Sequence, residues 1–139
     1  MLGLFKKAPK LEATFAPRTA VARELAKEVE VAGELVLRNV GKEVELRDLE
    51  TVLICGGTRR IDIDLPAAWR APQRIAAGAE LRATVSWKVP VVAPVRAPAA
   101  AIQVNTTTGG KITPLAVTER FPLANESPRA RAGARGPID

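Results

Sequence analysis

In three segments of the sequence an apolar residue or glycine stands at every second position, and this pattern constrains the fold more than any other feature. Residues 29–37, 60–65 and 81–89 each place a valine, leucine, isoleucine, alanine, glycine or tryptophan at every second position. A period of two residues puts these side chains on one face of an extended strand, whereas a helix needs a period of about 3.6 residues. Each segment is therefore predicted to be a β-strand with one buried face and one solvent-facing side.

The remaining segments also favour strands joined by turns. Further strands are predicted over residues 11–16, 44–54, 101–107 and 112–121. The strand over residues 11–16 ends at Pro17. Within residues 44–54 the alternation slips by one residue, and a β-bulge or a break near Asp48 would absorb the slip. Glycine pairs at 56–57 and 109–110 predict hairpin turns, and Pro90, Pro94 and Pro98 exclude a central strand across residues 90–98. Residues 18–28 have helix-favouring side chains, and we interpret them as either a short helix or a loop.

About seven or eight such strands predict an all-β protein, a two-sheet antiparallel sandwich of immunoglobulin-like type. A partly open barrel is the alternative. A length of 139 residues suits one domain with a core of its own. We place the sandwich at residues 11–124, between an N-terminal extension (1–10) and a disordered basic tail (125–139).

The chemistry of the chain is limited by the residues that it lacks. It has no histidine and a single cysteine, Cys55, which excludes the commonest general base, an internal disulfide and a multi-cysteine zinc site. Cys55 is interpreted as a buried structural thiol. Asp62 and Asp64 share one strand face and could hold a cation, but a solvated face beside Arg60 is the preferred interpretation. We expect no catalytic, cofactor-binding or metal-binding residues, and an enzyme that works with carboxylates is the remaining alternative.

Two groups of residues are candidates for contact with a partner. Trp69 and Arg70 lie between prolines, and an exposed Trp69 would mark a contact site, whereas the alternative is a tryptophan that plugs one end of the sandwich. Trp87 alternates with core residues and is assigned to packing. Arg129, Arg131 and Arg135 in the tail either pair with an anionic partner or keep the chain soluble.

Charge and location add weaker expectations. The net charge of +6 allows a nucleic acid or an anionic membrane surface as partner, although the basic residues are scattered singly. The first ten residues lack the order of a signal peptide, and no apolar run approaches the roughly 20 residues of a membrane span. A cytoplasmic protein is expected.

Several segments resemble a known family. Gly33–Gly41 is a glycine-led hydrophobic strand that runs into a glycine turn, and Val44–Ile54 is similar to the strand pair that follows it in the family. Residues 74–80, 81–90 and 101–107 match a glycine-containing loop, a strand ending in proline and a strand before a hairpin. Over about residues 11–121 the chain resembles one half of the arrestin-like proteins, particularly the bacterial sporulation-control type. Members usually carry two such domains.

The resemblance implies an arrestin-like sandwich with a regulatory or scaffolding role. Together with the missing reactive residues, it leads to a non-enzymatic module that binds a protein of unknown identity through sheet edges or end loops. Such a module can also self-associate by edge pairing. The alternative is a basic protein that binds nucleic acid or an anionic membrane surface.

Overall fold

The computed structural model describes residues 10–126 except 24–25, 58, 93–94 and 109. The described part is built almost entirely from strands, with one short 3-10 helix, η2 (Ala67–Trp69). The strands are β1 (Leu11–Arg23), β2 (Glu28–Asn39), β3 (Val44–Leu46), β4 (Leu49–Cys55), β5 (Arg59–Ile63), β6 (Gln73–Ile75), β7 (Glu80–Pro90), β8 (Ala99–Thr108), β9 (Lys111–Val117), β10 (Phe121–Pro122) and β11 (Ala124–Glu126). No helix of the described residues is long and apolar enough to cross a bilayer.

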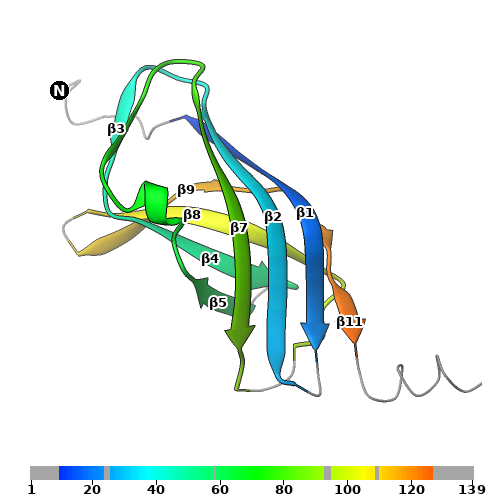
Figure 1. The fold of residues 1–139 in the computed structure, drawn as a ribbon. Coiled ribbons are helices and arrows are strands. Elements are labelled where there is room, and N and C mark those ends of the chain that lie inside the picture. Colours follow the sequence, from blue (N-terminus) through cyan, green and yellow to red (C-terminus); the bar gives the residue numbers. More distant parts are fainter. Residues whose placement is uncertain (1–9, 24–25, 58, 93–94, 109, 127–139) are drawn as a thin grey trace, which may run out of the picture.

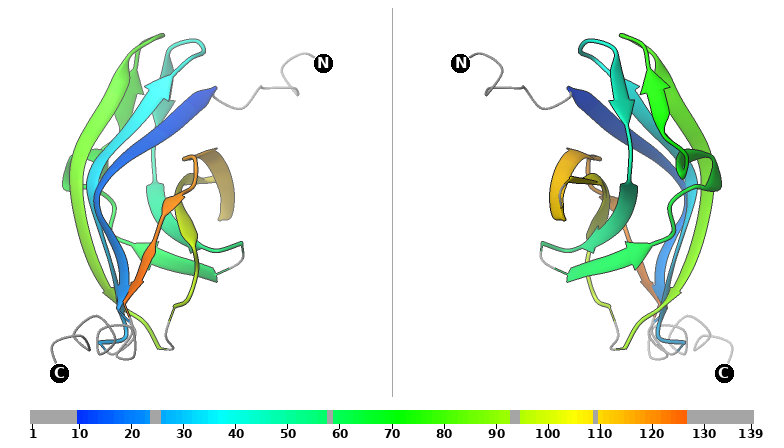
Figure 2. Two further views of the ribbon diagram at one scale, coloured as in Figure 1. Left: turned by 90° about the vertical axis from the view of Figure 1, so that its right-hand side faces the viewer. Right: turned by 90° about the vertical axis from the view of Figure 1, so that its left-hand side faces the viewer.

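The strands form two main sheets that face each other, as Figures 1 and 2 show. The first sheet has the order β11-β1-β2-β7, and the second has the order β10-β8-β4-β5 with β9 also paired to β8. A small ribbon of β3 and β6 lies at one end. Every described pair is antiparallel except β1 with β11, which is parallel. The predicted all-β sandwich is confirmed.

The core lies between the two sheets and uses the alternating residues. Val29, Val31, Leu35 and Leu37 of β2 are each at most 1% exposed. They meet buried side chains of the second sheet that include Leu53, Ile61, Ile63, Ile102 and Val104. Burial of each such side chain contributes about 1.5–3 kcal/mol. Trp87 of β7 is packed as predicted, and its indole Nε1 donates a hydrogen bond to the Asp64 carbonyl oxygen at 2.7 Å.

Residues 18–23 correct the sequence analysis, which expected a short helix or a loop there. They continue β1, because Val21 and Ala22 are buried and the pairing with β2 runs to Arg23 opposite Glu28. The strand passes Pro17 with a change of register between Pro17 and Thr19. A bulge shifts the alternation by one residue, and the adjacent residues Val21 and Ala22 are both buried, so the segment does not show the simple two-residue alternation of a strand with one solvent-facing side.

Two other predicted strands are divided. The slip near Asp48 is a break: Asp48 has φ +50°, β3 before it pairs with β6, and β4 after it belongs to the second sheet. Residues 112–121 form β9 and β10 with a gap between them. In that gap the Thr118 N–H donates to the Ile102 carbonyl at 2.9 Å, and the Ile102 N–H donates to Thr118 Oγ1 at 3.0 Å. The threonine thus bridges the interruption and fixes the path of the next residues.

Asn39 joins the end ribbon to the first sheet. It is fully buried, and its Nδ2 donates to the carbonyls of Lys42 at 2.7 Å and Ile75 at 3.0 Å. The Gly41 N–H donates to Asn39 Oδ1 at 2.9 Å. A buried polar side chain is stable only when its hydrogen bonds are made, so this residue holds the turns at that end of the sandwich in place.

Candidate functional site

Trp69 is not an exposed contact residue, which corrects one of the two predicted candidates. Its exposure is 2%, and it packs into the core at the end of η2. The backbone N–H of Trp69 donates to the Pro66 carbonyl at 2.8 Å. This bond closes the turn that begins at the proline, and the turn directs the indole inward. Arg70 follows it and is exposed. The alternative that Trp69 fills the sandwich is the correct one.

The other residues singled out for chemistry show no reactive arrangement. Cys55 is buried, and desolvation raises the pKa of its thiol, while the charge of Arg59 lowers that pKa by a smaller amount. A protonated thiol is a poor nucleophile. Asp62 and Asp64 are exposed, and no group of three potential metal ligands occurs among the described residues. Arg129, Arg131 and Arg135 lie outside the described residues.

The sheet edges offer a different kind of site, and two of them are protected against pairing. β5 has only five residues and carries the charges of Arg59, Arg60 and Asp62. β9 begins with Lys111 and contains Pro114, where its register with β8 shifts. Short edges, charges, prolines and bulges all discourage the addition of another strand. At the far edge of the first sheet, no described strand pairs with the outer side of β7, and the Trp87 side chain donates a hydrogen bond to the Asp64 carbonyl in the connection after β5.

The edge of β1 lacks most of this protection. β11 pairs only with its last three residues, and no other described strand pairs with the same edge between Leu11 and Ala20. Val40, which follows β2, donates its backbone N–H to the Lys10 carbonyl, so Lys10 directs this group toward β2. Since hydrogen-bonding direction alternates along an antiparallel strand, Leu11, Ala13 and Phe15 direct their N–H and C=O groups toward the unpaired edge. Pro17, which has no N–H, is suited to the same edge.

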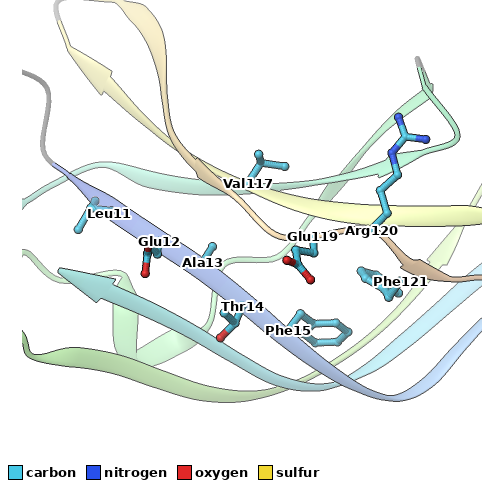
Figure 3. A pocket seen from close by; sticks show the side chains of 9 residues that line it. All are labelled: Leu11, Glu12, Ala13, Thr14, Phe15, Val117, Glu119, Arg120 and Phe121. Carbon is cyan, nitrogen blue, oxygen red and sulfur yellow. The ribbon is translucent and has the colours of Figure 1, made fainter. Parts of the chain in front are cut away.

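A groove of about 620 Å³ runs beside this unpaired edge (Figure 3). One wall is the first half of β1, and the other is the segment between β9 and β10 that Thr118 holds in place. The lining residues are Leu11, Glu12, Ala13, Thr14, Phe15, Val117, Glu119, Arg120 and Phe121. A smaller hollow of about 390 Å³ lies between Pro17–Ala20 and Pro122–Ala124. Together the two hollows extend along β1 toward the point where β11 pairs with it. We call the larger one, with its nine lining residues, the β1 groove.

The inner end of the β1 groove is aromatic. The rings of Phe15 and Phe121 have centroids 5.0 Å apart, and Phe15 also contacts Trp87 with a centroid distance of 6.5 Å. Phe121 is 5% exposed, so it belongs to the core, whereas Phe15 is half-buried. Val117 on the opposite wall is 54% exposed. The groove therefore combines unpaired backbone groups with apolar side chains, which is the combination that an added strand uses.

The sequence analysis did not assign Val117, Glu119, Arg120 or Phe121 to a site. These residues meet β1 only because β9, β10 and β11 return along its edge. Of these strands β11 pairs with β1, and the paired residues are about 100 positions apart in the sequence. One local signal was present: Pro17 stands within a strand, and proline within a strand indicates an edge. The sequence analysis instead interprets Pro17 as the end of the first strand.

The fold and the site define the chain as an all-β sandwich in which one strand edge, unpaired among the described residues, borders a groove of mixed polar and apolar lining. No protein-family model and no curated protein matches the sequence. Among solved structures, the chain is similar to a crystal structure of a candidate ApaA protein from Bordetella pertussis. That similarity has a TM-score of 0.49 and 15% sequence identity, and it covers 88% of this chain and 98% of the other.

Proposed function

We propose that this protein is a non-enzymatic interaction module that binds a protein partner along the unpaired edge of β1. The observation that supports this proposal is the β1 groove, where an edge with directed N–H and C=O groups borders a hollow whose inner end is aromatic. A strand that added there would satisfy these groups and bury side chains from Val117 and Phe15. Its role would be regulatory or scaffolding.

The resemblance to arrestin-like proteins belongs to the same proposal. Gly33–Gly41 is the second half of β2 and the turn after it, and Val44–Ile54 forms β3 and most of β4. Both segments lie in the framework of the sandwich, and β2 is the strand that supports β1. We propose an arrestin-like relation for this framework and a role in protein binding for the edge that it carries.

The test uses two matched substitutions on β9. Val117→Lys places an ammonium group in the wall of the β1 groove, and Ile112→Lys places the same group outside it on the same strand. The two side chains are similarly exposed, at 54% and 56%, so each substitution should change the free energy of unfolding by about 0.5 kcal/mol or less. We expect Val117→Lys to lower the amount of protein partner captured from native lysate by about tenfold or more, which corresponds to about 1.4 kcal/mol, and Ile112→Lys to leave it unchanged.

Salt and nuclease treatment separate this function from the nucleic-acid alternative. Capture by an added strand depends on backbone hydrogen bonds and apolar contacts, so it should survive about 0.5 M salt, whereas phosphate contacts weaken steeply as ionic strength rises. Equal capture by Val117→Lys and the unsubstituted protein would contradict the proposed site. Capture that is lost on nuclease treatment would contradict protein binding itself.

A further inference from the structure

We propose that the β1 groove takes an extended peptide strand whose side chains alternate between apolar and basic. This inference rests on the proposed function, and it specifies the partner's chemistry and the register in which it binds. The carrying observation is a pair of carboxylates, Glu12 and Glu119, that stand on opposite walls of the groove.

Glu12 and Glu119 differ from the other carboxylates on the strand surfaces. Glu34 and Glu80 pair with Arg82, and Glu45 pairs with Arg47. Among the residues that the structure describes, no cation forms an ion pair with Glu12 or Glu119, and both residues are exposed. In Figure 3 the Arg120 side chain extends away from β1, while the Glu119 carboxylate points toward it. The groove therefore presents two carboxylates that form no ion pair with a described residue, although Arg38 stands opposite Glu12 on β2 and Arg120 is one of the lining residues.

The register follows from the direction of the backbone groups. Leu11, Ala13 and Phe15 offer N–H and C=O groups to an incoming strand, and Pro17 ends the series because it lacks an N–H. Residues 11–17 extend about 23 Å at roughly 3.3 Å per residue. A strand of about seven residues therefore fits between the start of β1 and the point where the smaller hollow begins.

The two faces of that strand would meet different surroundings. Side chains on its inner face would lie against Phe15, Phe121 and Val117, which favours valine, leucine or isoleucine. Side chains on its outer face would lie beside Glu12 and Thr14, the outward residues of β1. Oppositely charged pairs on neighbouring strands are favourable, so lysine or arginine suits the outer positions. Alternation in the partner matches the alternation in β1.

A synthetic blocked heptapeptide tests this inference on the full chain. The probe is Lys-Val-Lys-Leu-Lys-Val-Lys, and its controls are Glu-Val-Glu-Leu-Glu-Val-Glu and the non-alternating Lys-Lys-Val-Leu-Val-Lys-Lys. Isothermal titration calorimetry at low salt should show the alternating basic peptide binding about tenfold more tightly than either control. That ratio combines a cross-strand charge pair with Glu12, the charge of Glu119 on the opposite wall and correct placement of the apolar side chains. At a higher salt concentration its preference over the acidic control should fall, because salt screens exposed charge pairs.

Charge-removing variants identify the carboxylates that are responsible. The double variant Glu12→Gln/Glu119→Gln should lose about tenfold in affinity for the basic alternating peptide. Asp62→Asn removes an exposed carboxylate from β5, at the other edge of the second sheet, and should leave the affinity unchanged. Because the substituted side chains are exposed, both variants should be folded like the unsubstituted protein. Circular dichroism melts of the three proteins check this.

The outcomes distinguish this inference from the function on which it rests. Equal affinity for the basic and acidic peptides, or an unchanged affinity in the double variant, would overturn the basic partner. If in that case Val117→Lys still abolishes partner capture, the edge remains the binding site and only the partner's chemistry is wrong. If neither the peptide binds nor Val117→Lys affects capture, both the inference and the proposed function fail.

Discussion

Replacing Gly33 by alanine is expected to lower the free energy of unfolding by about 3 kcal/mol, the upper end of the usual effect of overpacking. A Cβ atom at this position would lie 2.2 Å from the Ala16 carbonyl oxygen and 2.9 Å from Cζ of Phe15. The oxygen belongs to the backbone at the bulge of β1 and cannot move without disturbing the pairing with β2. The absence of a side chain at Gly33 is what allows β1 to bulge against β2.

Urea denaturation of Gly33→Ala and the unsubstituted protein measures this effect through the midpoint and the slope. Gly57→Ala is the matched control, since a Cβ there meets no atom within 4 Å, and its free energy of unfolding should change by about 0.5 kcal/mol or less. Equal stabilities of Gly33→Ala and Gly57→Ala would show that β1 and β2 do not approach each other as described.

Trp69→Ala is expected to cost about 4 kcal/mol of stability. Trp69 is 2% exposed and contacts the core. Truncation of a buried tryptophan removes the transfer free energy of the indole and leaves a cavity, and the typical cost is about 3–5 kcal/mol. The expected melting temperature falls by roughly 10 °C or more for a domain of this size.

The neighbouring substitution Arg70→Ala provides the comparison for Trp69→Ala. Arg70 is exposed at the end of η2, so its removal should change the free energy of unfolding by about 0.5 kcal/mol or less. Differential scanning calorimetry on both variants gives the two melting temperatures. A native melting temperature for Trp69→Ala would restore the interpretation of Trp69 as an exposed contact residue and contradict the described core.

The parts of the fold that were predictable are those with local causes. Val29–Leu37 and Leu81–Val89 carry an apolar residue or glycine at every second position because each strand has one face in the core, and Gly56, Gly57 and Gly110 mark turns between neighbouring strands. Residues 18–23 were not predicted as strand, because the adjacent Val21 and Ala22 are both buried and the segment is stabilised by its pairing with β2. Propensity is a weak guide where tertiary pairing decides the structure.

The candidate site depended on contacts that no local pattern reveals. Trp69 has no alternating neighbours, so its burial is decided by the turn at Pro66 and by the space between the sheets. The β1 groove exists because β11 pairs with β1 over three residues only, while the Thr118 bridge directs Glu119 and Arg120 to the surface. Sequence reasoning predicted binding through sheet edges or end loops, and the structure provides a specific edge to test.

Amide hydrogen exchange, followed residue by residue by NMR, tests the central claim that β1 has an unpaired edge that binds a strand. In the free protein we expect the amides of Glu12 and Thr14 to be protected by β2, and those of Leu11, Ala13 and Phe15 to exchange about 100-fold faster or more, because exchange requires a broken or absent hydrogen bond. Addition of Lys-Val-Lys-Leu-Lys-Val-Lys should slow the three fast amides and leave the other two unchanged. Equal protection of all five amides in the free protein would contradict the account, since the edge would already be paired.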